Sequence, residues 1–201
     1  MYLSRLVLSP GRATADWLRN VYQIHQRVRL ALPDDPRPLY RLERGWADGL
    51  CLLVQSVEQR PDWEKAFGDL PIVERYDLKR YEPDFKTGQA FAFRLRGSPS
   101  VVRQGARYPL LEEVAQYAWL DRKLAAAGAK VLIREIVGRE QQRARKTFGG
   151  RQITITHHGV LFEGWLMVQE PEKLAATVRA GVGAAKGLGF GLLSIMSPRQ
   201  S

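Results

Sequence analysis

Short apolar segments follow one another in the order strand, helix, strand, strand, helix, strand, and this order occurs twice along the chain. Alternating apolar and polar residues indicate the strands, and apolar residues spaced by three and four indicate the helices. In the first half the expected strands cover residues 2–9, 39–43, 50–56 and 72–78. The first expected helix ends near Ala31, and the second covers residues 61–67. Three prolines between Leu32 and Pro38 exclude a helix there, so the first helix must end before them.

The second half of the chain repeats this pattern. Its expected strands cover residues 90–96, 130–137, 152–156, 160–168 and 190–195, and its expected helices cover residues 110–127 and 171–180. A basic loop with Arg103 and Arg107 is expected before the first of these helices, and a tight turn is expected at His157-His158-Gly159. Because this element order is the ferredoxin-like one, the sequence predicts an α+β protein of two tandem ferredoxin-like (βαββαβ) domains, residues 1–82 and 90–201.

Tyr22 and His25 lie three residues apart on the first expected helix, a spacing that places both side chains on one side of a helix. The helix can begin after Thr14 or after Asn20, since both are capping residue types. An apolar stripe on the same helix consists of Trp17, Val21, Ile24 and Val28. Tyr22 and His25 lie beside this stripe, so they are expected at the edge of the buried face. A phenol and an imidazole in contact can move protons near neutral pH without a metal, although such pairs more often serve only for packing.

The charge of the chain is strongly basic, with 31 basic and 21 acidic residues and a net charge of +10. Such an excess indicates a polyanionic partner, most simply nucleic acid. Residues 139–151 hold five basic residues and one acidic residue, a net charge of +4. Because this run lies between two expected strands, a functional hairpin is favoured over a loop that is only solvated.

Metal, disulfide and membrane sites are not expected. Cys51 is the single cysteine and lies in an apolar strand, which indicates a buried thiol in a reducing cytoplasm. His157 and His158 are adjacent, and neighbouring strand residues point to opposite faces, so the two histidines cannot easily hold one ion. No apolar run is long enough to cross a bilayer, and the first residues are too short a segment for a signal peptide. We therefore expect no metal, no cofactor and no membrane.

The segment Gly181–Gly191 is rich in glycine but fits neither common nucleotide-binding motif. A dinucleotide site needs a strand, a loop and then a helix, whereas here a helix precedes the glycines and a strand follows them. The Gly-Lys-Ser/Thr ending of a phosphate-binding NTPase loop is absent from the sequence. Two alternatives remain open: a backbone that another chain can approach closely, with Lys186 supplying a charge, or a tight connection packed against the neighbouring half.

Six segments that follow one another along the whole chain resemble the CasE family. They are Met1–Arg5, Tyr22–Gln26, Phe93–Arg96, Ala118–Leu124, Phe162–Gly164 and Gly181–Ser194. CasE proteins are the CRISPR repeat-RNA endoribonucleases of the type I-E Cascade complex, which acts in antiviral defence. Each segment alone is weak, but the combination of an early Tyr-x-x-His with a terminal glycine-rich segment and Leu-Leu-Ser is specific.

The resemblance implies two ferredoxin-like domains and cleavage of precursor CRISPR RNA within each repeat, at the 3′ base of a hairpin, without a metal. His25 corresponds to the catalytic histidine of the family and Tyr22 to its tyrosine partner. The nucleophile is expected to be the 2′-hydroxyl of the RNA, so the products are a 2′,3′-cyclic phosphate and a 5′-hydroxyl. A cation is expected beside the phosphate, and the candidates are Lys146, Arg151 and Lys186.

The expected RNA-binding residues are basic side chains that would hold phosphates and make affinity salt-dependent. They are Arg103, Arg107, Arg122, Lys123, Arg143, Arg145, Lys146, Arg151 and Lys186. The resemblance further implies that the cleaved RNA stays bound and enters Cascade with its other subunits. The alternative is a non-catalytic RNA-binding or assembly subunit, in which Tyr22 and His25 would be covered rather than border a basic groove. A small-molecule enzyme would leave the net charge unexplained.

Overall fold

The computed structural model describes residues 1–46, 49–148 and 151–197, and for residues 45–46, 143–148 and 151–155 it describes the backbone alone. The chain divides into two compact units. The first unit consists of Met1–Glu82, Gln142–Thr156 and Lys186–Gly189; the second consists of Pro83–Gln141, His157–Ala185 and the chain from Phe190 on. The domain boundaries expected from the sequence, 1–82 and 90–201, stay a prediction.

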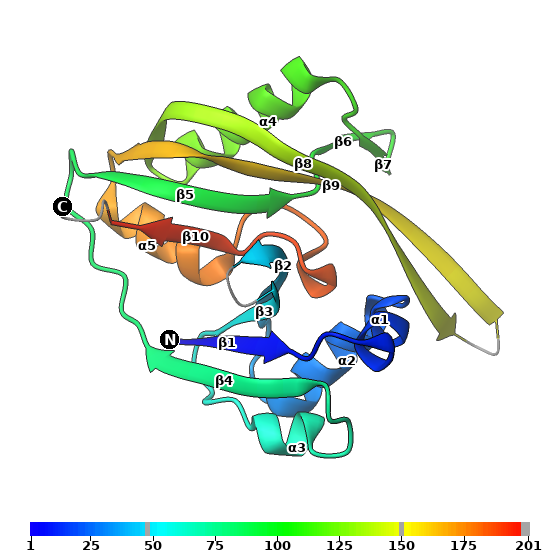
Figure 1. Ribbon diagram of the computed structural model, residues 1–201. Helices are drawn as coiled ribbons and strands as arrows, with labels where there is room; N and C mark the ends of the chain where they lie inside the picture. The colour runs from blue at the N-terminus through cyan, green and yellow to red at the C-terminus, as the bar shows by residue number, and fades with distance from the viewer. Residues whose placement is uncertain (47–48, 149–150, 198–201) are drawn as a thin grey trace. The chain divides into compact units, whose positions relative to one another are not determined.

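A four-stranded antiparallel sheet forms the centre of the first unit, with the strand order β2-β3-β1-β4. Its elements are β1 (Tyr2–Leu8), α1 (Arg12–Leu18), α2 (Tyr22–Ala31), β2 (Leu39–Trp46), β3 (Gly49–Ser56), α3 (Trp63–Phe67) and β4 (Val73–Arg80). The three helices lie on one face of this sheet (Figure 1). This order, with β1 between β3 and β4, is the ferredoxin-like one.

Side-chain alternation along the strands explains which face of this sheet is covered. Leu6 and Leu8 of β1 and Leu52 and Val54 of β3 point to the same side and are buried in one hydrophobic core. The helices contribute Trp17, Ile24, Val28, Trp63 and Phe67 to the same core. The aromatic rings meet edge-on or tilted, since the ring of Phe67 lies 5.8 Å from that of Trp17 and 6.2 Å from that of Trp63.

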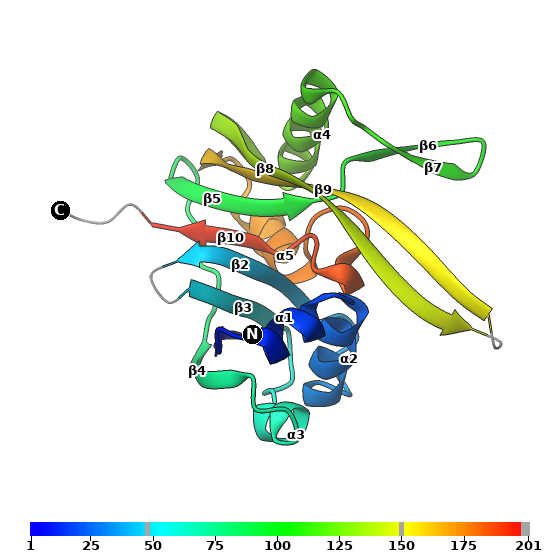
Figure 2. The same ribbon diagram turned by 45° about the vertical axis from the view of Figure 1, so that its right-hand side comes forward.

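The second unit repeats the strand order as β10-β5-β9-β8. Its elements are β5 (Ala90–Gly97), β6 (Ser100–Arg103), β7 (Ala106–Pro109), α4 (Glu113–Ala126), β8 (Ala129–Phe148), β9 (Arg151–Val168), α5 (Pro171–Ala180), the 3-10 turn η1 (Lys186–Leu188, assigned to the first unit) and β10 (Leu193–Met196). Figure 2 shows α4 and α5 behind the four strands, and Trp119 of α4 stacks on Phe162 of β9 at 6.1 Å. The predicted α+β class with a repeated ferredoxin-like arrangement is confirmed.

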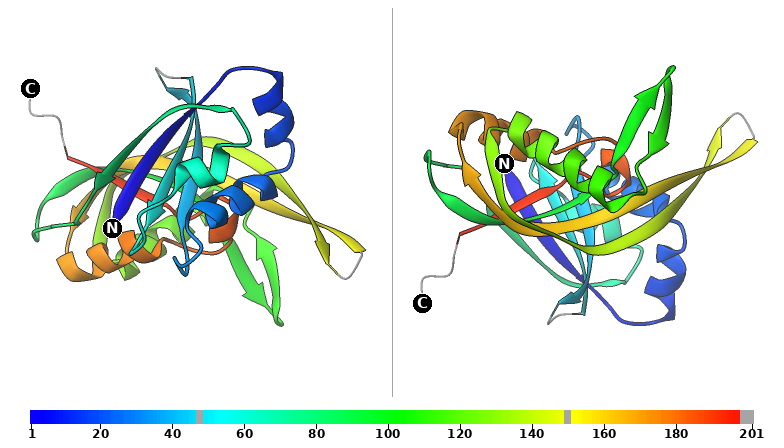
Figure 3. Two further views of the ribbon diagram at one scale, coloured as in Figure 1. Left: turned by 90° about the horizontal axis from the view of Figure 1, so that it is seen from below. Right: turned by 90° about the horizontal axis from the view of Figure 1, so that it is seen from above.

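Two local predictions for the second unit are wrong. The expected loop with Arg103 and Arg107 is a separate hairpin, β6–β7, reversed at Gln104 and Gly105, whose φ angles are 49° and 76° (Figure 3). The expected turn at His157-His158-Gly159 lies inside the long strand β9. A Cβ on Gly159 would lie 2.8 Å from the ring of Phe190, so close packing, and not a turn, accounts for that glycine.

We expect Leu52→Ala to lower the free energy of unfolding by about 2–5 kcal/mol, because it removes a fully buried side chain from the first unit's core. The measurement is urea denaturation followed by circular dichroism. Leu30→Ala is the matched control, since Leu30 of α2 is 40% exposed and its loss should cost about 0.5 kcal/mol or less. Equal losses in the two variants would contradict the assignment of this core.

Candidate functional site

Tyr22 and His25 lie one turn apart at the start of α2 and their rings are in contact. The ring centroids are 5.6 Å apart and the ring planes are tilted by 32°. Both side chains are half-buried, whereas Ile24 and Val28 on the neighbouring stripe are fully buried. The predicted position of the pair at the edge of the buried face is therefore confirmed.

A break in the helical segment places Tyr22 at the beginning of α2. The sequence left two starts open, and the structure has two helices: α1 begins after Gly11, and α2 begins after Asn20 and Val21. The Asn20 Oδ1 accepts a hydrogen bond from the Tyr22 N–H at 3.2 Å, and the Asn20 carbonyl accepts one from the Gln23 N–H at 2.9 Å. Asn20 thus satisfies two free N–H groups at the start of α2, as a capping asparagine does.

The turn η1 lies directly against His25, although about 160 residues separate them in the sequence. A Cβ on Gly187 would be 3.4 Å from both Cε1 and Nδ1 of His25, which is contact distance. Gly187 follows Lys186, one of the three candidate cations, and Lys186 is half-buried. The structure therefore brings the backbone that carries Lys186 to the Tyr22/His25 pair.

Aromatic rings meet the glycine-rich segment at two further points. A Cβ on Gly189 would lie 3.1 Å from the ring of Tyr40, and a Cβ on Gly183 would lie 2.9 Å from the ring of Trp119. Both glycines also have positive φ angles, 84° and 78°. Of the two alternatives for this segment, the described contacts favour a tightly packed connection.

The remaining candidate RNA-binding residues are distributed over several elements. Arg103 on β6, Arg107 on β7 and Arg122 on α4 are exposed, and Lys123 on α4 is half-buried; all four belong to the second unit. The Arg107 Nη1 donates a hydrogen bond to the Ser100 Oγ at 3.0 Å. The other four candidates have strand backbones in β8 or β9, but their side chains lie outside the described residues: Arg143, Arg145, Lys146 and Arg151.

The environment of His157 in the second unit lowers its pKa. Burial lowers the pKa of His157 below its usual value of 6.5, and the nearby charges of Arg107 and His158 lower it further. Its ring lies 6.0 Å from that of Phe190. Among the residues that the structure describes, no three histidine, cysteine, aspartate or glutamate side chains are grouped so that they could hold a metal ion.

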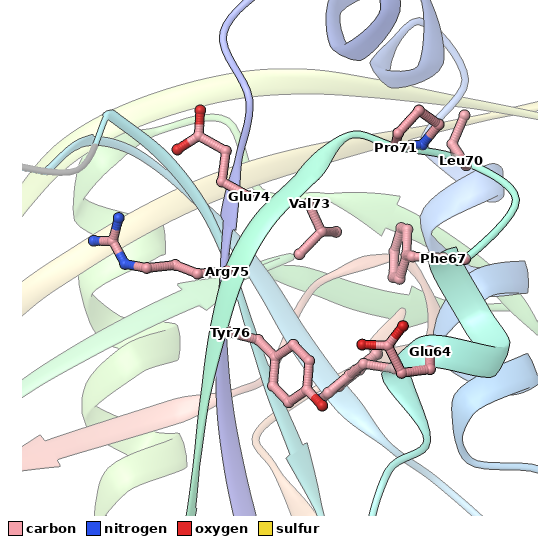
Figure 4. Close-up of a pocket in the computed structure, with 10 residues that line it drawn as sticks. Glu64, Phe67, Leu70, Pro71, Val73, Glu74, Arg75 and Tyr76 are labelled. Carbon is pink, nitrogen blue, oxygen red and sulfur yellow. The ribbon is translucent and has the colours of Figure 1, made fainter.

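A pocket of about 350 Å³ opens between α3 and the start of β4 (Figure 4). Trp63, Phe67, Val73 and Tyr76 line it together with Glu64 and Glu74. Its lining includes none of the site residues expected from the sequence. Separately, no helix in the described part of the chain is long and apolar enough to span a membrane.

Tyr40 is a site residue that the sequence does not reveal. Its hydroxyl donates a hydrogen bond to the Gly187 carbonyl at 2.8 Å, across 147 residues of sequence. An alternating strand such as 39–43 predicts only that Tyr40 points into the core. Gly187 and Gly189 offered an indirect signal, since glycines often mark a place where another part of the chain approaches the backbone closely.

Comparison with known proteins places these features in a family. The family model described as CRISPR associated protein matches residues 1–197. The chain belongs to this family. One relative is the CRISPR-associated endoribonuclease Cse3 of Thermus thermophilus, 35% identical over 97% of this chain and 99% of that protein. Another is the CRISPR system Cascade subunit CasE of Escherichia coli, 29% identical over 97% of this chain and 98% of that protein.

A solved structure of a family member shows the same fold. It is Thermus thermophilus Cse3 bound to an RNA representing a pre-cleavage complex. It aligns with a TM-score of 0.83 and 32% sequence identity, over 98% of each chain. The resemblance to the CasE family inferred from the sequence is confirmed.

We expect the imidazole of His157 to titrate below pH 6.5, and Arg107→Gln to raise its midpoint by removing a neighbouring positive charge. The measurement is an NMR pH titration of the His157 ring proton. Arg103→Gln on the same hairpin is the control and should leave the midpoint unchanged. Because the lowered pKa favours the neutral ring, the stability that His157 contributes should be complete above pH 6.5 and fall as the pH drops through the folded-state pKa. A midpoint at or above 6.5 would contradict this environment.

Proposed function

We propose that this protein is a metal-independent endoribonuclease that cleaves precursor CRISPR RNA within the repeat, at the base of the hairpin. The contact between the half-buried rings of Tyr22 and His25, at 5.6 Å, carries the proposal. Family membership supports it, because relatives over nearly the whole chain are named as an endoribonuclease and as a Cascade subunit. The solved complex of Cse3 with a pre-cleavage RNA supports the same substrate class.

The proposed reaction needs only proton transfer and stabilisation of charge by the protein. The 2′-hydroxyl oxygen attacks the adjacent phosphorus, the bond from phosphorus to the 5′-oxygen breaks, and the proton of the 2′-hydroxyl ends on the 5′-oxygen. His25 transfers a proton at one of these two oxygens, as general base or general acid. Tyr22 touches the imidazole and orients the ribose or shares the proton transfer. The products are a 2′,3′-cyclic phosphate and a 5′-hydroxyl.

A cation beside the phosphate would stabilise the charge that develops on its oxygens. Lys186 is adjacent in sequence to Gly187, whose Cβ would contact the His25 ring at 3.4 Å, and is therefore a candidate on geometry. Lys146 and Arg151 are candidates on sequence. Comparing the single-turnover rates of Lys146→Ala, Arg151→Ala and Lys186→Ala at saturating protein would identify the residue that acts.

After cleavage, we propose that the protein keeps the processed RNA and joins the other Cascade subunits in the cytoplasm. The net charge of +10 supports retention, since neutralising phosphates releases counterions and holds RNA at moderate salt. The alternative of a non-catalytic assembly subunit predicts a covered Tyr22/His25 pair. The partial exposure of both side chains therefore favours the catalytic proposal.

We expect the purified protein to cut a CRISPR-repeat hairpin once in excess EDTA, and His25→Ala to slow that cut by about 10²- to 10⁴-fold. Tyr22→Phe should slow it by about 10-fold, because it removes one hydrogen-bonding hydroxyl and leaves the ring in place. The measurement is single-turnover cleavage of labelled RNA at saturating protein, with analysis of the product ends.

Gln26→Ala is the control for α2, because Gln26 is exposed on the same helix. This variant should cleave the RNA at the wild-type rate. A substrate with a 2′-deoxy sugar at the cut should bind but stay intact. Tight binding without a cut by the wild-type protein would replace the proposal with the assembly role.

We expect Arg143→Ala with Arg145→Ala to weaken RNA binding by about 10-fold and to reduce the salt slope of the affinity by about 2, one for each phosphate contact. The cleavage rate of fully bound RNA should change by less than about threefold, because phosphate contacts position the RNA rather than act on the reacting atoms. Filter binding over a range of salt concentrations measures the first effect. Arg60→Ala, at an exposed arginine outside the predicted set, is the control. A saturating rate that falls as far as the affinity would count against this division.

A further inference from the structure

Tyr40 lies on β2, an edge strand of the first unit's sheet, and points to the face that the helices cover. It is only 2% exposed and belongs to the same core as Ile24 and Val28 of α2. His25 lies on α2 next to Ile24, at the edge of that core. Tyr40 and His25 therefore stand on two elements that pack together in one unit.

The Tyr40 hydroxyl holds the turn η1 at its centre. It donates to the Gly187 carbonyl at 2.8 Å, and the Gly189 N–H closes the turn on the Lys186 carbonyl at 3.4 Å. The ring of Tyr40 also packs against Gly189, where a Cβ would be 3.1 Å away. A buried tyrosine hydroxyl needs such a partner, so the contact fixes both the side chain and the turn.

The same glycine that accepts this hydrogen bond lies beside the catalytic candidate, His25. A Cβ on Gly187 would make ordinary contact, at 3.4 Å, with Cε1 and Nδ1 of His25, so the backbone of the turn lies within the width of a methyl group of the imidazole. A displacement of Gly187 would change the space available to the imidazole and the position of Lys186 beside it.

We propose that Tyr40 is a positioning residue for RNA cleavage, which holds the turn η1, with Gly187 and Lys186, beside the imidazole of His25 through its hydroxyl. This inference rests on the proposed endoribonuclease function. Tyr40 is buried and its hydroxyl donates to the turn, so we expect it to act through the turn rather than on the RNA. Its hydroxyl should therefore affect the rate of the bound complex and leave RNA affinity almost unchanged.

The central test is Tyr40→Phe, which keeps the buried ring and removes the hydroxyl. We expect the single-turnover rate at saturating protein to fall by about 10- to 100-fold, since small displacements of a catalytic group have effects of this size. The dissociation constant for the repeat hairpin should change by less than about threefold. Tyr76→Phe is the matched control, because Tyr76 on β4 is 41% exposed and should behave as wild type.

A second readout reports on His25 without any cleavage. The chain has three histidines, so the imidazole region of a proton NMR spectrum is simple, and the His25→Ala spectrum assigns the His25 signal. We expect Tyr40→Phe to shift the His25 ring signal and its titration midpoint while His157 and His158 stay in place. Tyr76→Phe should move none of the three.

Gly187→Val provides an independent variant, because its methyl groups would extend beyond a Cβ that already touches the imidazole. It should slow cleavage and shift the His25 signal with Tyr40 intact. The double variant with Tyr40→Phe should lose less rate than the product of the two single losses, since both changes act on the same turn.

The outcomes separate this inference from the proposed function. A Tyr40→Phe protein that cleaves within about twofold of the wild-type rate, with an unmoved His25 signal, would overturn the positioning role and leave the endoribonuclease proposal intact. A rate loss with an equal loss of affinity and an unmoved His25 signal would also overturn it, because the effect would then be one of general stability. If the wild-type protein cuts no repeat RNA, the proposed function fails, and the inference that rests on it fails as well, whatever the His25 signal shows.

Discussion

The hydrogen bond from the Tyr40 hydroxyl to the Gly187 carbonyl joins the beginning of the chain to its end, across 147 residues. Around it, η1 lies beside the His25 ring, which a Cβ on Gly187 would contact at 3.4 Å, and it packs tightly on Tyr40, since a Cβ on Gly189 would lie only 3.1 Å from that ring. The first compact unit therefore includes Lys186–Gly189 in addition to Met1–Glu82. Residues 1–82 contain Tyr22 and His25, but the surroundings of the pair are completed by a turn from the far end of the sequence.

The sequence predicts best those features that depend on neighbours along the chain. Alternation in β1 and β3 places Leu6 and Leu52 in the core, and the 3-residue spacing of Tyr22 and His25 brings their rings together, as the structure shows. It fails where a glycine serves a distant partner. Gly159 resembles a turn residue, yet it lies inside β9 because Phe190, 31 positions further along, packs against it.

The same limit holds for the candidate site: residues with a local sequence signal could be predicted, and residues defined by a distant partner could not. Lys186 could be singled out as a charge within a glycine-rich segment, and the structure brings that segment to His25. Tyr40 could not be singled out, because a tyrosine in an alternating strand has the same local pattern whether its hydroxyl holds a turn or not. The environment of His157 was equally hidden, since the charge of Arg107 reaches it from a hairpin about 50 residues earlier.

The two units also show how little the fold itself determines the chemistry. Both contain the same four-strand order, and both place a tyrosine on the helix that precedes the second strand of the fold. In the first unit Tyr22 contacts His25 at the edge of the core. In the second unit the Tyr117 hydroxyl accepts a hydrogen bond from the Ile136 N–H of β8 at 3.2 Å, and the ring lies 5.0 Å from the guanidinium of Arg134. That tyrosine connects its helix to the sheet. The same fold therefore carries a structural tyrosine in the second unit and a candidate proton-transfer pair in the first. The difference lies in the residue three positions after the tyrosine, which is His25 in the first unit and Leu120 in the second.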